Sequence, residues 1–258
     1  MHRFRYAAIA AVAATVALTG CETLKGADTG ALAAAGGSAF KALSLSDGEI
    51  TTMSDQSCAA MDQKNQIAAA NSAYATRLNK VVQRMPTTIN GKKADYKVYV
   101  TQDVNAWAMA NGCIRVYSGL MDLMNDDELR GVIGHEIGHV ALGHSKSRMQ
   151  TAYAASAVRG LAAASGNSAL TALSQSQAGD LAEKFVNAQF SQSQESAADD
   201  YSFELLTERR MERKGLVTSF EKLAKLSGGG SGSSILSSHP PSAERAARMQ
   251  KRLDAAKK

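Results

Sequence analysis

The chain has 258 residues, of which 45% are hydrophobic and 21% are charged, and it contains only 3 Pro and 21 Gly. This composition excludes a disordered tail, a collagen-like rod and a disulfide-dense miniprotein. A net charge of +5 arises from 29 basic and 24 acidic residues, and no basic block is interleaved with aromatic residues, so we expect no nucleic-acid partner. A chain of this length can bury a core without a metal, so any metal site is expected to be functional.

Residues 1–20 are typical of an export signal, because two arginines precede an uncharged, Ala-rich stretch from Tyr6 to Leu18. The stretch ends in Leu-Thr-Gly-Cys21, which resembles a bacterial lipobox and implies cleavage before Cys21 and acylation of its thiol. A plain signal peptide followed by a chance cysteine is the alternative. Since Glu22 is not the Asp that favours inner-membrane retention in lipobox proteins, we expect a periplasmic protein whose lipid anchor lies in the outer membrane.

Behind the signal, residues 21–45 are expected to form the lipid anchor and a flexible spacer, because they are rich in Ala, Gly and Ser. Residues 46–258 are expected to form a single domain. If Cys21 carries lipid, Cys58 and Cys113 are the remaining thiols, and an oxidising periplasm favours a disulfide between them. Two buried free thiols are the alternative.

The periodicity of apolar residues predicts a mainly helical fold with a small β-sheet, of the α+β class. Apolar residues three and four apart predict one helix from about Asp55 to Met85, before Pro86. Alternating β-branched and aromatic residues predict short strands at Tyr96 to Thr101 and at Cys113 to Ser118. The clearest helix begins at Asn125, which can form a capping box with Glu128. Helical spacing returns from Leu181 to about Lys214 and continues, with one Gly/Ser loop, toward the end of the chain.

The helix that begins at Asn125 carries His135-Glu-Ile-Gly-His139, an H-E-x-x-H motif. Positions four apart share one helix face, so both imidazoles can bind one metal while Glu136 flanks it. The alternative is two surface histidines in a chance pentapeptide, but the four glycines of this helix indicate that another element approaches its backbone closely. His144, which follows the helix, is expected to interact with the helix dipole rather than to bind metal.

A catalytic zinc usually has three protein ligands and one position for water. Glu195 is the best candidate for the third ligand, because Glu195-Ser-Ala-Ala-Asp199 places a carboxylate at the start of a predicted helix and a second one turn later. Asp199 could hydrogen-bond the distal nitrogen of His135 and fix its tautomer. Alternatively, both carboxylates only stabilise the positive end of a helix.

Three motifs, in this order, resemble metallopeptidase family 48, which includes the CAAX prenyl endopeptidases, the HtpX heat-shock proteases and a branch of periplasmic lipoproteins. They are His135-Glu-Ile-Gly-His139, Glu195-Ser-Ala-Ala-Asp199 and Ser238-His-Pro-Pro241 followed by Arg245. The resemblance runs from about Met61 to Met249 and implies a gluzincin fold with one Zn²⁺ per chain. It also implies roles for six residues: His135, His139 and Glu195 as ligands, Glu136 as base, and His239 and Arg245 as residues lining the site.

Asn105-Ala106-Trp107-Ala108 also resembles the family pattern, in which a strand beside the zinc helix receives the peptide. We further expect the next strand to be an exposed edge that binds substrate through Cys113, Ile114, Arg115 and Val116. The sequence departs from the family at Met109-Ala-Asn-Gly112, where relatives often have Leu-Pro-Gly-Gly. It also lacks the transmembrane helices of the HtpX and CAAX branches, which favours the lipoprotein branch.

The expected function is therefore that of a zinc-dependent endopeptidase of the bacterial cell envelope, which cleaves unfolded or misassembled proteins. His239 or Arg245 is expected to stabilise the oxyanion, although a histidine before Pro-Pro can simply order a loop and the arginine can be a solvated surface residue. The alternative function is an outer-membrane assembly factor or chaperone that binds clients through the same groove and acts with the assembly machinery. The complete motif favours the enzyme, because a pure binding protein has no need of Glu136.

Overall fold

The computed structural model describes residues 44–157, 173–227, 234–239 and 243–256. The expected signal, Cys21 and the spacer up to residue 43 lie outside the described residues. Among those described, no helix has both the length and the apolar character needed to cross a bilayer.

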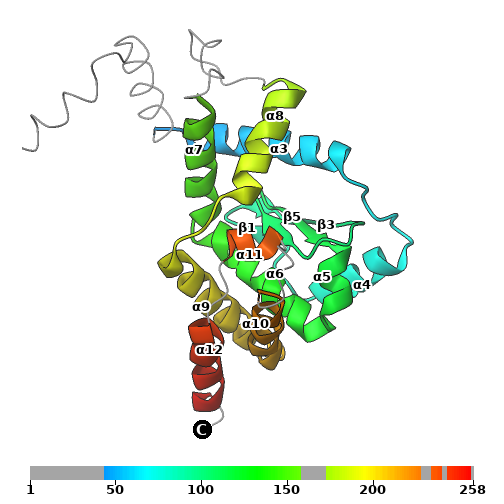
Figure 1. The fold of residues 1–258 in the computed structure, drawn as a ribbon, viewed down its shortest axis with the longest axis vertical. Coiled ribbons are helices and arrows are strands. Elements are labelled where there is room, and N and C mark those ends of the chain that lie inside the picture. The colour runs from blue at the N-terminus through cyan, green and yellow to red at the C-terminus, as the bar shows by residue number, and fades with distance from the viewer. Residues whose placement is uncertain (1–43, 158–172, 228–233, 240–242, 257–258) are drawn as a thin grey trace, which may run out of the picture.

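Helices dominate the described part of the chain, and they surround small sheets, as the sequence predicts (Figure 1). The helices are α3 (Asp47–Lys64), α4 (Ala73–Val82), α5 (Ser118–Leu123), α6 (Asp126–Ala141), α7 (His144–Ala157), α8 (Gln175–Asn187), α9 (Gln192–Glu208), α10 (Lys214–Ser227), α11 (Ser234–Ser238) and α12 (Ala243–Ala255). The strands are β1 (Thr88–Ile89), β2 (Lys92–Lys93), β3 (Asp95–Tyr99), β4 (Ala106–Ala108) and β5 (Cys113–Tyr117). In Figure 1, α3, α7 and α8 group at one end, α9, α10 and α12 at the other, and the sheet and α6 lie between them.

The single helix predicted from Asp55 to Met85 is wrong, because the structure has two helices there, α3 and α4. Asn65 ends α3 by donating both its backbone and side-chain N–H groups to the carbonyl of Met61. Ser72 begins α4 by capping it. Between the helices, backbone hydrogen bonds join the chain to the end of β3 and beyond. Apolar spacing continues across the break, which is why periodicity alone does not detect it.

The three-stranded sheet has the order β3-β5-β4, with β5 parallel to β3 and antiparallel to β4. The prediction that β5 is an exposed edge strand is therefore wrong: Cys113, Ile114, Arg115 and Val116 lie in a central strand and are buried. The edge beside α6 is instead β4. Alternating β-branched residues are typical of paired strands in general, and the short Ala-Trp-Ala segment gives no strand signal of its own.

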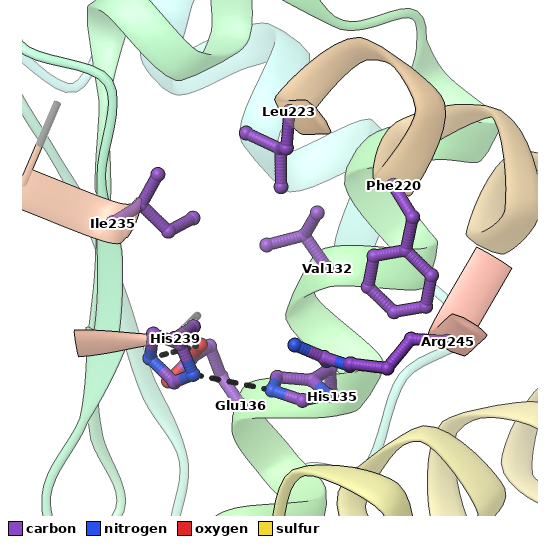
Figure 2. Close-up of a pocket in the computed structure, with 8 residues that line it drawn as sticks. All are labelled: Val132, His135, Glu136, Phe220, Leu223, Ile235, His239 and Arg245. Atoms are coloured by element: carbon purple, nitrogen blue, oxygen red, sulfur yellow. Dashed lines mark hydrogen bonds and ion pairs between the residues drawn. The ribbon is translucent and has the colours of Figure 1, made fainter. Parts of the chain in front are cut away.

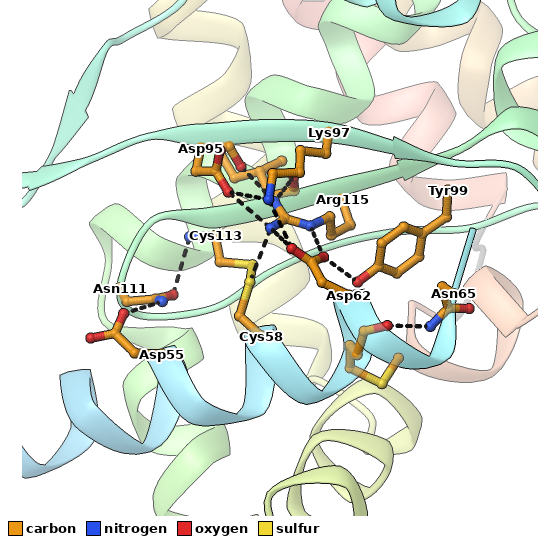
Figure 3. The surroundings of a disulfide bond; sticks show 12 residues. Asp55, Cys58, Asp62, Asn65, Asp95, Lys97, Tyr99, Asn111, Cys113 and Arg115 are labelled. Carbon is orange, nitrogen blue, oxygen red and sulfur yellow. Dashed lines mark hydrogen bonds and ion pairs between the residues drawn. A yellow bond between two sulfur atoms is a disulfide. The ribbon is translucent and has the colours of Figure 1, made fainter. Parts of the chain in front are cut away.

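The expected disulfide joins Cys58 of α3 to Cys113 at the start of β5, with a Cα–Cα distance of 6.5 Å (Figure 3). Beside it, the buried Arg115 pairs with the carboxylates of Asp62 and Asp95 at 2.8–2.9 Å. Burial would raise the pKa of Asp62, but hydrogen bonds from Arg115 and two neighbouring side chains lower it to about 2. Arg115 thus ties the sheet to α3, and its guanidinium is engaged by these two carboxylates.

Helix α6 packs with its backbone close to α9 and α10, as its glycines predict. A Cβ atom on Gly134 would lie 2.5 Å from the Ser202 hydroxyl oxygen of α9. A Cβ on Gly131 would lie 2.8 Å from the Cα of Leu216 in α10. The Cα of Leu216 is a backbone atom and cannot rotate away, so Gly131 is the position that requires glycine more strictly.

We expect Gly131→Ala to lower the free energy of unfolding by about 1–3 kcal/mol, since the added methyl group forces α6 and α10 apart. Gly48→Ala in α3 is the control: it also adds a methyl group to a helix, but its nearest neighbour would be 4.0 Å away. That variant should be neutral or up to about 1 kcal/mol more stable. Denaturant unfolding of both variants measures the difference, and equal effects would contradict the close packing of α6 on α10.

Candidate metal centre

The helix that carries the H-E-x-x-H motif is fixed at its start by the predicted capping box. The Asn125 side chain accepts the N–H groups of Asp127 and Glu128, and the Glu128 carboxylate accepts the N–H of Asn125 at 2.8 Å. The apolar residues of α6 pack into the core. The motif lies in the C-terminal half of this helix, and its three polar residues, His135, Glu136 and His139, are at most 4% exposed.

Two other elements bring the remaining polar groups to the same place. Ser191 caps α9, which puts Glu195 in its first turn and Asp199 one turn later. His239, directly after α11, completes a buried group of four residues whose ligand atoms all lie within 4.8 Å of one another: His135, His139, Glu195 and His239. The structure therefore brings together the three predicted ligands and adds a fourth donor, which the sequence placed only in the lining of the site.

The distances within this group suit a bound cation. The Nε2 atoms of His135 and His139 are 3.0 Å apart, and that of His139 is 3.3 Å from a carboxylate oxygen of Glu195. The Nδ1 of His239 is 2.9 Å from the same oxygen. Three imidazole nitrogens and a carboxylate, all buried and converging, are the donors that Zn²⁺ prefers. The residues therefore fit a zinc ion.

Asp199 and Arg245 support the group through contacts with His135 and Glu195. Asp199 lies 2.9 Å from the Nδ1 of His135, the contact that the sequence predicts. Arg245 of α12 donates two hydrogen bonds to Asp199, at 2.8 and 2.6 Å, and its third nitrogen lies 2.5 Å from Glu195. Arg245 thus lines the site as expected, but the donors of its guanidinium are directed at these two carboxylates.

Phe190 is a site residue that the sequence analysis missed. Its ring stacks on that of His139, with centroids 3.7 Å apart and an interplanar angle of 17°. The guanidinium of Arg148 covers Phe190 at 4.1 Å, and burial lowers the pKa of this arginine to about 10. The Phe190 N–H also donates to the Ser238 carbonyl just before His239. No motif marks Phe190, because a single aromatic residue between two helices resembles any core residue.

Burial and neighbouring charges separate the two glutamates of the site. Burial raises the pKa of Glu136, and the nearby imidazoles of His239 and His135 only partly oppose it. Burial would also raise the pKa of Glu195, but the same two imidazoles and His139 lower it strongly. Burial lowers the pKa of His139 well below its ordinary value. One Glu136 oxygen has no hydrogen-bond partner among the described residues and lies 3.5 Å from the Nε2 of His239.

A small pocket opens beside these groups, and Figure 2 shows apolar side chains on the side away from Glu136. The apolar lining consists of Val132, Phe220, Leu223 and Ile235, and the polar lining consists of His135, Glu136, His239 and Arg245. The apolar and polar parts of this lining lie on opposite sides of the pocket, so the polar residues of the site face a hydrophobic wall.

Comparison with known proteins places this site in a family. Over 249 residues the chain is 53% identical to the metalloprotease LoiP of Escherichia coli, covering 96% of this chain and 97% of that protein. It is 50% identical over 248 residues to the metalloprotease YcaL of the same organism, with the same coverage. A shorter stretch of 66 residues, 24% of the chain, is 39% identical to 23% of the protease HtpX of Actinobacillus pleuropneumoniae. Residues 72–253 match Peptidase family M48, and the chain therefore belongs to this family of metalloproteases.

Proposed function

We propose that this protein is a zinc-dependent endopeptidase of the bacterial cell envelope, of the gluzincin type, which cleaves unfolded or misassembled polypeptides. The observation that carries the proposal is the position of Glu136. Its buried carboxylate has an oxygen that makes no hydrogen bond among the described residues, and it lies on the same helix turn as His135, which converges with His139 and Glu195. A protein that only binds clients, such as an assembly factor or chaperone, needs no such group.

The ligands in this proposal are His135, His139 and Glu195, which α6 and α9 hold rigidly. A catalytic site keeps one position for water, so we assign His239, which directly follows the short α11, to the side that faces substrate. A zinc ion bound here would supply a Lewis acid that activates water and polarises the peptide carbonyl. Glu136, whose burial favours proton uptake, takes the proton from water and delivers it to the leaving amine. The Nε2 of His239 is the available donor for the developing oxyanion.

We propose that substrate binds as an added strand on β4, the edge that includes Asn105, Ala106 and Trp107. Alternation along the β4–β5 ladder directs the backbone groups of Ala106 and Ala108 to the outer edge. The Asn105 side chain accepts the N–H of Ala106, and Ser145 donates to the carbonyl of Ala108. This leaves the carbonyl of Ala106 and the N–H of Ala108 for an extended peptide, but all three residues of β4 are buried, so the elements that cover the strand must move to admit it. A folded client must also open first.

The cellular part of the proposal rests on the sequence. The expected signal and the lipobox at Cys21 support a periplasmic protein whose lipid anchor lies in the outer membrane. Unfolded or misassembled envelope proteins would be the natural clients, and contact with the outer-membrane assembly machinery is a second proposal of the same kind. Fractionation of cells that express the chain or its Cys21→Ala variant tests the anchor, because only the acylated form should partition with the outer membrane.

Glu136→Gln should leave Zn²⁺ binding intact but reduce hydrolysis of casein to background, because the ligands remain while the base is lost. Zinc content, measured by atomic absorption, and turnover are compared with those of the wild type. A matched control is Glu128→Gln, since Glu128 lies on the same helix outside the cluster. Retained turnover in Glu136→Gln would show that another group acts as base.

Glu195→Gln should weaken Zn²⁺ binding far more than Asp199→Asn does, although each substitution removes one buried carboxylate charge and keeps its shape. The first removes a ligand. The second weakens only the support of His135, for which about a 10- to 100-fold loss in metal affinity is expected. Competition with a chelator measures both affinities, and the reverse ranking would mean that ligand and support have been exchanged.

Ala108→Pro should lower kcat/KM for an unfolded client by about 2- to 10-fold, the value of one main-chain hydrogen bond. Proline removes the outward N–H of β4 without removing a bond of the β4–β5 ladder. Ala108→Ser keeps the N–H and is the matched control. Equal activity of the two variants, or equal cleavage of one client in its folded and denatured forms, would contradict strand addition.

A further inference from the structure

His144 is the one histidine of the region that the proposed reaction does not use. It is the first residue of α7 and lies three residues after the end of α6. Gly143, with φ of +76°, reverses the chain between the two helices. On a continuous helix a residue five positions after His139 would point about 140° away from it. The turn instead brings the two rings together, with centroids 5.1 Å apart.

The two α6 histidines are held in corresponding ways. His135 turns its Nε2 toward the centre of the site, and its Nδ1 lies 2.9 Å from Asp199. His139 likewise turns its Nε2 toward the centre, and its Nδ1 lies 3.1 Å from the Nδ1 of His144. We propose that His144 is a positioning residue, which accepts a hydrogen bond from the Nδ1 of His139 and so fixes the tautomer that can bind metal.

The assignment of donor and acceptor follows from proton counting and rests on the proposed metal site. Two ring nitrogens 3.1 Å apart form a hydrogen bond only if one carries a proton and the other a lone pair. A histidine that binds a metal through Nε2 keeps its proton on Nδ1. The proton in this contact therefore belongs to His139, and His144 presents the lone pair of its Nδ1 with its own proton on Nε2. Stacking of Phe190 on the face of His139 then leaves the ring little freedom to rotate.

His144 itself is outside the group of converging donors, which contains His135, His139, Glu195 and His239. It reaches that group only through His139. Its effect should therefore appear first in metal affinity and in the tautomer of His139. A neutral residue that offers an acceptor atom at the same distance from the backbone should replace it.

The test compares His144→Asn with His144→Leu, which are similar in size. The Asn side chain can present an oxygen where the Nδ1 of histidine lies, whereas Leu offers no acceptor. We expect Leu to weaken Zn²⁺ affinity by about 10- to 100-fold, as for other groups that orient a ligand, and Asn to stay close to the wild type. Chelator competition measures the affinities, and thermal unfolding of the metal-free proteins confirms that the three folds are equally stable.

The possible results distinguish a failure of the proposed function from a failure of the proposed role of His144. A wild type that binds no Zn²⁺ refutes the proposed function itself. If the wild type binds, but the Leu variant binds equally well or the Asn variant is as weak as Leu, an acceptor at position 144 is not what holds His139. A second measurement does not depend on the variants: the ¹⁵N chemical shifts of the zinc-loaded wild type should show a protonated Nδ1 on His139 and an unprotonated Nδ1 on His144. The opposite pattern would overturn the proposal.

Discussion

The structure depends on the burial of two carboxylates, those of Glu195 and Asp199, on one face of α9. Buried charges are stable only when partners replace the water they lose. Here Arg245 pairs with both carboxylates, and the imidazoles of His135 and His139 face them. Each of these partners comes from a different helix than α9, so the need to neutralise the carboxylates fixes how α6, α9 and α12 meet. The geometry of the candidate metal centre is a consequence of that requirement.

The site geometry also requires close packing of α6 against its neighbours. The distances in the site are attainable only because α6 can approach its neighbours without side chains at Gly131, Gly134 and Gly138. These glycines lower the intrinsic helix propensity of α6, and the capping box at Asn125 partly offsets that loss by fixing the start of the helix. The glycines therefore weaken the helix locally but permit the close packing that holds the site rigidly. Such a conflict is expected at a functional site.

The sequence predicts the mainly helical fold and the cap of α6 because each rests on a local signal. The disulfide is predicted instead from the two cysteines other than Cys21 and the expected compartment, and the convergence of His135, His139 and Glu195 from their motifs and the family resemblance. Capping residues and four-residue spacing act within a few positions of the chain. The order of strands depends on distant parts of the chain: β5 is central because β4, a strand that only the family resemblance predicts, returns to pair with it. The contacts of Phe190 and His144 depend on chain reversals, and spacing alone cannot reveal which ring a turn brings beside His139.

The contrast between Glu136 and Glu195 shows how one residue type can serve two purposes within one site. Both side chains are buried, yet the pKa of Glu136 is raised while that of Glu195 is lowered. The difference arises because three imidazoles, those of His239, His135 and His139, lie 2.9–3.5 Å from the Glu195 carboxylate and outweigh its burial, whereas His239 and His135 only partly oppose the burial of Glu136. Since the guanidinium of Arg245 already serves two carboxylates, a developing oxyanion would have to compete with them for it. The Nε2 of His239 makes no hydrogen bond among the described residues and has one carboxylate oxygen near it, that of Glu136 at 3.5 Å, so it is less engaged than Arg245.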